Sequence, residues 1–221
     1  MMHSISESNG ISLITPEDRS IYSVGISTGG VAEIRMAQKS PLCRIIATTV
    51  DQKGAQIARE KIYHEHLSQQ IDVKIEDISQ PLPYEERFFD FVYARLVLHY
   101  LSKKDLTLAL AELHRVLKTT GKLFIVVRSK ECQEARHGTL NPETGMTTYV
   151  SDNGHTYMRY FHDFASIRSH LKQAGFHINH IKAYDEQLCI DFARTIPSKQ
   201  IDTLIEVFAQ KGVLDECSSH C

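Results

Sequence analysis

Apolar residues follow two alternating patterns along the first 130 residues of the chain. Short runs rich in β-branched and aromatic residues predict strands, and apolar residues spaced three or four apart predict amphipathic helices. The predicted strands are residues 20–24, 43–50, 71–75, 88–94 and 122–127. The predicted helices between them are residues 31–39, 53–67 and 102–117. Such alternation is typical of an α/β domain.

The alternation stops at residue 128. Residues 128–160 are polar, contain several glycines and show neither period, so we predict a lid or substrate loop, or else a mobile segment. A helix is predicted at 164–174, then two strands at 176–184 and 187–195, with a link too short for a parallel crossover. Apolar spacing predicts a last helix at 198–211. The domain is predicted over residues 17–212, with an N-terminal extension (1–16) and a C-terminal tail (213–221).

Composition narrows the class of protein and of partner. The 221 residues are 42% apolar and 24% charged, which is ordinary globular usage and excludes a disordered chain. With 25 basic and 27 acidic residues the net charge is −2, so we expect neither a nucleic-acid partner nor a membrane. The first ten residues lack the basic and apolar regions of a signal peptide, and the five cysteines are scattered. A cytoplasmic location is therefore expected.

A glycine-rich turn, GISTGG at residues 25–30, follows the first predicted strand. Glycine permits positive φ angles and close approach of the backbone to a ligand. The dinucleotide pattern G-x-G-x-x-G is not met, because Ser27 stands where its second glycine belongs. The turn alone is equally consistent with a ligand-binding loop and with a tight structural turn.

Two acids follow the next two predicted strands. Asp51 lies 22 residues after Gly29 (51 − 29), close to the roughly 20-residue interval at which an acid meets a ribose diol. The alternative is that Asp51 caps a helix. Asp77 can accept a hydrogen bond from an adenine amino group while Ile78 packs on the ring, or it is simply a loop acid. Both acids would lie at the carboxyl edge of a parallel sheet, where such folds bind ligands.

These features occur in an order that resembles one known family. The segments are GISTG (25–29), VD (50–51), DI (77–78), FDFVYARLVLHYL (89–101), LHRVLKTTGKL (113–123), RYF (159–161) and QAGF (173–176). Together they resemble the class I S-adenosylmethionine-dependent methyltransferases, over roughly residues 19–209. The resemblance implies a Rossmann-like three-layer sandwich whose seven-stranded sheet is mostly parallel, with an antiparallel last strand.

The resemblance also implies a cofactor and a reaction. S-Adenosylmethionine would be bound by the following residues: Gly25, Ser27, Gly29, Asp51, Gln52, Asp77, Ile78 and Arg95. The activity would be in-line methyl transfer to a small-molecule acceptor, a preference that follows from the balanced charge. His99, just past the fourth strand, would be the general base if the acceptor must lose a proton, or would instead pack in an apolar helix start. Tyr157 and Arg159 would contact the substrate.

Two positions depart from the family pattern. Ser23 stands where the family has an acid that serves the methionine amino group, and Ser27 replaces the middle glycine of the loop. A serine at position 27 is tolerated if its φ stays negative. Two rival hypotheses follow: a non-catalytic cofactor-binding or interaction protein, and a nucleotide-binding oxidoreductase. No metal is expected, because the histidine pairs 64/66 and 177/180 lack further ligands nearby in sequence.

Overall fold

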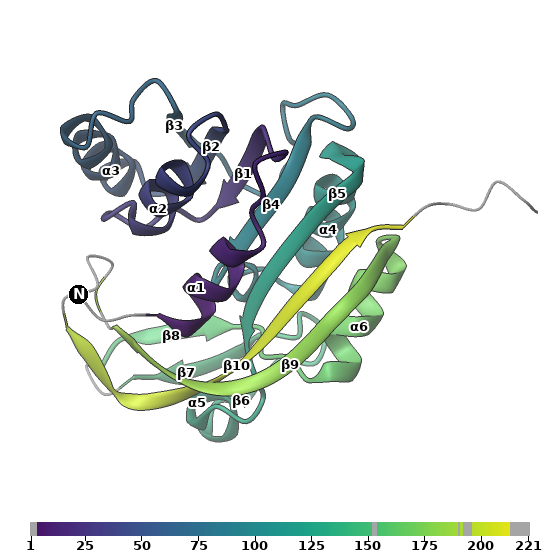
Figure 1. The fold of residues 1–221 in the computed structure, drawn as a ribbon. Coiled ribbons are helices and arrows are strands. Elements are labelled where there is room, and N and C mark those ends of the chain that lie inside the picture. Colours follow the sequence, from purple (N-terminus) through teal and green to yellow (C-terminus); the bar gives the residue numbers. More distant parts are fainter. Residues whose placement is uncertain (1–3, 152–153, 190, 192–195, 213–221) are drawn as a thin grey trace, which may run out of the picture.

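The computed structural model describes residues 4–151, 154–189, 191 and 196–212, which form a seven-stranded sheet with helices on both faces (Figure 1). The strand order is β3-β2-β1-β4-β5-β10-β9. The strands are β1 Ser20–Val24, β2 Arg44–Thr49, β3 Ile71–Ile75, β4 Phe89–Arg95, β5 Leu117–Arg128, β9 Phe176–Cys189 and β10 Pro197–Lys211. Strands β1 to β5 pair in parallel, and β10 is antiparallel to both of its neighbours. The predicted fold class is therefore confirmed.

Two apolar cores, one on each face of the sheet, make the three layers. Helices α1 (Ile5–Ser12), α2 (Val31–Lys39) and α3 (Gln52–His64) cover one face, and α4 (Lys103–Val116) and α6 (Phe164–Gln173) cover the other (Figure 1). Successive side chains of a strand point to opposite faces. In β4, Phe91 and Tyr93 accordingly enter the first core, and Val92 and Ala94 enter the second.

The predicted helix at 198–211 is wrong: these residues lie in β10. Leu204, Ile205 and Phe208 have the three- and four-residue spacing of an amphipathic helix, but Val207 and Ala209 are equally apolar and buried. β10 is hydrogen-bonded to β5 and β9 along its two edges, and the cores on both faces cover its middle part, with Leu204 in one core and Ile205, Val207 and Ala209 in the other, so the apolar run fits a central strand. Sheet pairing therefore overrides the helical period.

The predicted hairpin of strands at 176–184 and 187–195 is also wrong. A single long strand, β9, covers Phe176–Cys189, and its antiparallel partner is β10. Residues 190 and 192–195, in the second predicted strand, lie outside the described residues. The polar pair Asp185 and Glu186, which indicates a turn, is instead paired with β10 in register.

Residues 128–160 contain regular elements that their sequence does not predict. They form the helix α5 (Gln133–His137) and an antiparallel sheet of β6 (Thr139–Leu140), β7 (Thr147–Val150) and β8 (Thr156–Arg159). Strands of two to four residues are too short to show a period. The backbone N–H of Tyr160, just after β8, donates to the carbonyl of His99 at 2.8 Å, which places this small sheet beside the end of β4.

The segment at 1–16, predicted as an extension, contributes α1 to the domain. Ile11 and Ile14 are buried in the same core as α2 and α3. A side chain at Gly10 would meet the rings of Phe124 and Tyr93 within 2.6 Å, so α1 packs directly on β4 and β5. The predicted tail, 213–221, lies outside the described residues.

Candidate active site

The glycine turn joins the carboxyl end of β1 to α2. The amides of Gly25 and Ile26 both donate to the carbonyl of Thr48 on β2, at 2.9 and 2.8 Å. Gly25 has a φ of +83°, and a Cβ there would lie 2.8 Å from a methyl carbon of Val97. Position 25 therefore requires glycine, because of both its backbone angle and the segment that follows β4. Gly29 has no such backbone requirement and is half-buried.

Ser27 is compatible with the turn. In the described part of the chain, the non-glycine residues with positive φ are His66, Arg87 and Leu96, so Ser27 meets the condition under which its side chain is tolerated. Its hydroxyl is buried and has no hydrogen-bond partner among the described residues. A buried hydroxyl without a partner costs free energy, which a ligand in the turn would recover.

A carboxylate reaches the end of β1 from α2. Glu33, in the first turn of α2, is 3% exposed, and Ser23 Oγ donates to its Oε1 at 2.6 Å. The acid that the family pattern places at position 23 is absent, but an acidic group lies within hydrogen-bond distance of it. No local pattern predicts the contact between Glu33 and Ser23, because ten residues and a turn separate them in the sequence.

The two predicted acids lie at the ends of adjacent strands. Asp51 is exposed directly after β2 and also caps α3, since its Oδ1 accepts from the amide of Lys53 at 3.0 Å. Gln52, next to it, is exposed. Asp77 is exposed after β3 and accepts from the amide of Ser79 at 2.9 Å. The helix-cap alternative for Asp51 is thus observed, and it leaves the carboxylate at the edge where a ribose contact was predicted.

Apolar side chains accompany these acids. Val50 is 69% exposed and Ile75 is 48% exposed, although each directly follows or ends a buried strand. Ile78, predicted to pack on an adenine ring, is instead buried in the core below the sheet. The exposed apolar surface beside the acids thus comes from Val50 and Ile75, which sequence reasoning missed because they read as the ends of strands.

Arg95, predicted to contact the cofactor, is directed toward α1. Its Nε donates to Ser6 Oγ at 2.7 Å and its Nη2 to Ser4 Oγ at 2.8 Å, and Glu186 on β9 lies 3.6 Å away. The side chain is 9% exposed. These contacts hold the start of α1 against β9 and explain why an arginine ends β4.

His99, the predicted base, lies in a short 3₁₀ helix (Leu98–Tyr100) after β4 and is 2% exposed. Burial lowers the pKa of its imidazole well below the usual value, and the charges of Arg159 and Arg128 lower it further. The ring is therefore neutral at pH 7, and its Nδ1 has no hydrogen-bond partner in the part of the chain that the structure describes. A neutral imidazole has the protonation state of a base, although burial limits its access to substrate.

The two predicted substrate residues meet in the small sheet. The guanidinium of Arg159 lies over the rings of Tyr100, Tyr149 and Tyr157, at 5.4, 5.5 and 5.4 Å from their centroids. It also donates to the hydroxyl of Tyr149 and, at 3.4 Å, to that of Tyr100. We call these three tyrosines the tyrosine group. The sequence predicts substrate contact for Arg159 and Tyr157 and a lid anchor at Tyr149, but it gives no indication of Tyr100.

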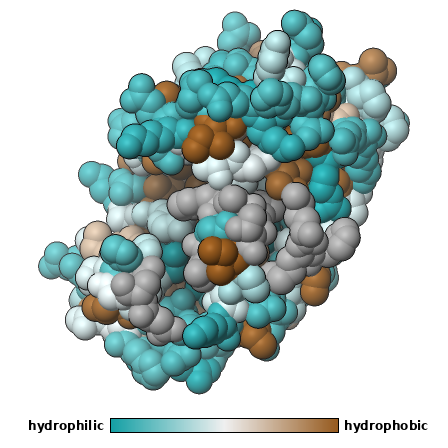
Figure 2. Space-filling model, turned by 90° about the vertical axis from the view of Figure 1, so that its left-hand side faces the viewer, coloured by the Kyte–Doolittle hydropathy of each residue, from teal (hydrophilic) through white to brown (hydrophobic). Residues whose placement is uncertain are grey.

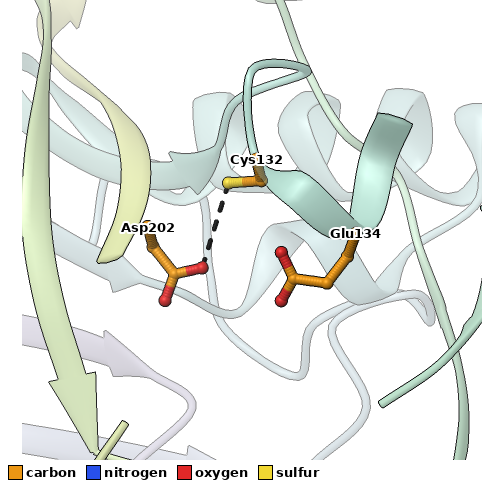
Figure 3. A group of neighbouring side chains, drawn as sticks. All are labelled: Cys132, Glu134 and Asp202. Atoms are coloured by element: carbon orange, nitrogen blue, oxygen red, sulfur yellow. Dashed lines mark hydrogen bonds between the residues drawn. The ribbon is translucent and has the colours of Figure 1, made fainter. Parts of the chain in front are cut away.

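Figure 3 shows Cys132, Glu134 and Asp202, whose ligand atoms lie within 4.8 Å of one another. Arg128, at the end of β5, donates to Asp202 and, at 2.9 Å, to Glu134. Burial raises the pKa of Asp202 to about 6 and that of the Cys132 thiol to about 11. The guanidinium of Arg128 supplies the positive charge for both carboxylates, so in this structure the group forms an ion-pair network.

Figure 2 shows hydrophobic residues, coloured brown, near the middle of one face of the molecule. They lie between two parts of the surface that are mainly hydrophilic and coloured teal. No helix in the described residues is long and apolar enough to span a membrane.

A hollow of about 700 Å³ is lined by residues 139–143 and Thr148. It shares no residue with the glycine turn, the two acids or the tyrosine group, so we do not include it in the site.

Part of the sequence resembles a known protein family, and the fold resembles known structures. A family model described as a methyltransferase domain matches residues 23–125. No protein with a curated description matches the sequence. An S-adenosylmethionine-dependent methyltransferase from Methanosarcina mazei has the same fold with a TM-score of 0.76 and 17% identity, over 96% of this chain and 100% of that one.

Two further structures show how widely this fold is used. A methyltransferase of the same cofactor class from Aquifex aeolicus aligns with a TM-score of 0.62 and 16% identity, over 93% of this chain and 89% of that one. The [4+2]-cyclase SpnF aligns with a TM-score of 0.66 and 20% identity, over 93% of this chain and 80% of that one. These likenesses establish the fold, which serves both methyl transfer and, in SpnF, cyclisation.

Proposed function

We propose that the chain is a class I Rossmann-like methyltransferase, which transfers a methyl group from S-adenosylmethionine to a small-molecule acceptor; the methyltransferase-domain model over residues 23–125 and the shared fold support this. One observation carries the proposal. The glycine turn, with Gly25 at a φ of +83°, and the carboxylates of Asp51 and Asp77 all lie at the carboxyl ends of the neighbouring strands β1, β2 and β3. This edge is where open α/β sheets bind nucleotide-like ligands.

The residues at this edge fit the proposed cofactor. In this proposal Asp51 accepts from the ribose hydroxyls and Asp77 accepts from the adenine amino group. The exposed side chains of Val50 and Ile75 offer apolar contact to the ring. The partnerless hydroxyl of Ser27 offers a donor within the turn. When bound, the cofactor supplies a methyl group on a positively charged sulfur, and the work of the protein is to align the acceptor and exclude water.

On the acceptor side, the small sheet β6–β8 covers the ends of β4 and β5. His99 is the candidate base on this side, and because burial and the charges of Arg159 and Arg128 lower the pKa of its imidazole, it is a weak base suited only to an acceptor that loses its proton readily. The near-balanced charge of the chain favours a small molecule over a nucleic acid.

Calorimetric titration with S-adenosylhomocysteine tests the cofactor site. We expect saturable binding, and the absence of binding at millimolar ligand would overturn the proposal. Asp51→Asn and Asp51→Ala should both weaken binding by about 1–3 kcal/mol, because each removes the charged acceptor. Only Asp51→Ala should also lower stability, by about 1 kcal/mol, since asparagine still caps α3. If affinity is unchanged in both variants, Asp51 is a helix cap alone.

Glu33 is proposed to bind the ammonium group of the cofactor in place of the acid missing at position 23. Glu33→Gln should weaken S-adenosylhomocysteine binding about 10- to 100-fold, because a charge-assisted contact is lost. Binding of 5′-methylthioadenosine, which lacks the amino-acid end, should stay unchanged. The double variant Ser23→Asp/Glu33→Gln returns a carboxylate to β1 and should recover affinity. Equal weakening of both ligands would mean that Glu33 only supports the turn.

Methyl transfer itself needs a separate measurement, because the fold also serves a cyclase. Release of S-adenosylhomocysteine from S-adenosylmethionine in the presence of a panel of acceptors supports the transferase. Cofactor binding without transfer to any acceptor would favour the non-catalytic alternative.

A further inference from the structure

Arg159 carries a charge that its surroundings do not match with a direct ion pair. Among the described residues no carboxylate forms a salt bridge with its guanidinium, and the nearby Glu134 is paired with Arg128. The guanidinium is instead held by the tyrosine group through its ring faces and two hydroxyls. Aromatic faces attract a cation but do not neutralise it.

One edge of this guanidinium carries a buried donor that has no acceptor among the described residues. Nη1 donates to Tyr149 and Nη2 makes a long contact of 3.4 Å to Tyr100, whereas the buried Nε has no partner among the described residues. Nε and Nη2 lie side by side on one edge of the planar group. Two parallel N–H groups at this spacing match the two oxygens of a carboxylate.

The position of this edge connects it to the proposed reaction. Arg159 is followed by Tyr160, whose backbone N–H donates to the carbonyl of His99. Tyr100, whose ring contacts the guanidinium of Arg159, is the residue after His99. Val97, three residues before Tyr100, lies against Gly25 of the cofactor turn. The arginine is therefore joined to the glycine turn through one short segment, and lies on the side where an acceptor would meet the cofactor.

We propose that Arg159 binds a carboxylate carried by the acceptor, which makes the substrate class a small carboxylic acid. This inference rests on the proposed function. A carboxylate fits better than a phosphate dianion, because Arg128 is bound to Glu134 and Asp202 and Arg159 alone of these two arginines offers a free donor edge among the described residues. The ring of Tyr157, which is half-exposed, lies against the guanidinium on the outer side of this group.

The test compares benzoate with benzamide, which have the same ring and differ in charge. Calorimetry is carried out on the full chain, with and without saturating S-adenosylhomocysteine. We expect benzoate to bind at least about tenfold more tightly than benzamide. Arg159→Gln should remove this preference, and Arg159→Lys should reduce it, because lysine keeps the charge without the paired donors. Arg136→Gln is the matched control, since Arg136 is an exposed arginine of the same 128–160 segment.

Three results of these titrations count against a carboxylate site at Arg159. No benzoate binding at about 50 mM, equal binding of benzamide, or unchanged benzoate affinity in Arg159→Gln would overturn the proposal. Thermal melting and S-adenosylhomocysteine affinity report whether the variants fold, and if Arg159→Gln does not, Arg159→Lys decides. If the wild-type chain does not bind S-adenosylhomocysteine, the proposed function is overturned instead. The benzoate titration in the absence of S-adenosylhomocysteine still tests the role of Arg159.

Discussion

Replacement of Arg128 by methionine is expected to lower the free energy of unfolding by about 3–5 kcal/mol, because it leaves two carboxylates without their shared cation. Asp202 is 3% exposed, and both Asp202 and Glu134 are bound by Arg128 in this structure. Methionine keeps much of the length and apolar stem of arginine, so the change isolates the charge. Urea unfolding at pH 7.5 measures the effect.

Two further variants separate the ion-pair network from other causes of instability. Lys61→Met breaks an exposed pair with Glu65 on α3 and should cost no more than about 1 kcal/mol. Adding Asp202→Asn to Arg128→Met removes one of the stranded charges and should recover part of the loss. A loss below about 1 kcal/mol in Arg128→Met, or no recovery in the double variant, would contradict the ion-pair network of Arg128 with Glu134 and Asp202, the two carboxylates drawn in Figure 3.

Stability is expected to fall as the solution is acidified below pH 6.5, and His162 to be one cause. Burial lowers the pKa of this fully buried ring to about 3, whereas an unfolded histidine has a pKa of about 6.5. Between these values the unfolded chain binds a proton that the folded chain does not, so protons favour unfolding. The contribution is absent above pH 6.5 and amounts to about 2 kcal/mol at pH 5.

His162→Phe tests this by keeping an aromatic ring that cannot be protonated. The difference in unfolding free energy between pH 7.5 and pH 5 should be about 2 kcal/mol smaller in the variant than in the wild-type chain. The pKa of Asp202 is raised to about 6, so its protonation stabilises the folded chain as the pH falls over part of this range. Because Asp202 is present in both proteins, its effect cancels in the comparison. His64→Gln, at an exposed histidine, should leave the difference unchanged. An identical pH dependence in His162→Phe would mean that His162 is protonated in the folded chain.

Local patterns were sufficient for the first five strands and the helices between them. Each strand is a short apolar run, each helix shows its own period, and Asp51 and Ser102 mark two of the helix starts by capping them. The same reasoning placed Asp51 and Asp77 at one edge of the sheet, because the carboxyl ends of neighbouring parallel strands necessarily meet there.

Patterns failed where the environment of a residue comes from distant parts of the chain. The apolar spacing in 198–211 fits a helix as well as a strand, and only the neighbours β5 and β9 decide between them. Arg95 follows a strand at the predicted edge, yet Ser4, Ser6 and Glu186 turn it toward α1. Side-chain direction of this kind depends on partners separated by 90 residues or so in sequence.

The sequence by itself determined that this is a Rossmann-like domain and which edge of its sheet carries the glycine turn, Asp51 and Asp77, since both follow from periodicity and from strand ends. Only the tertiary structure decided which side chains meet around that edge. Glu33 comes to Ser23, the tyrosine group encloses Arg159, and Arg128 joins Glu134 to Asp202. These groups meet across loops and strands, and the charge that each side chain experiences is set by burial and by neighbours that no local pattern encodes.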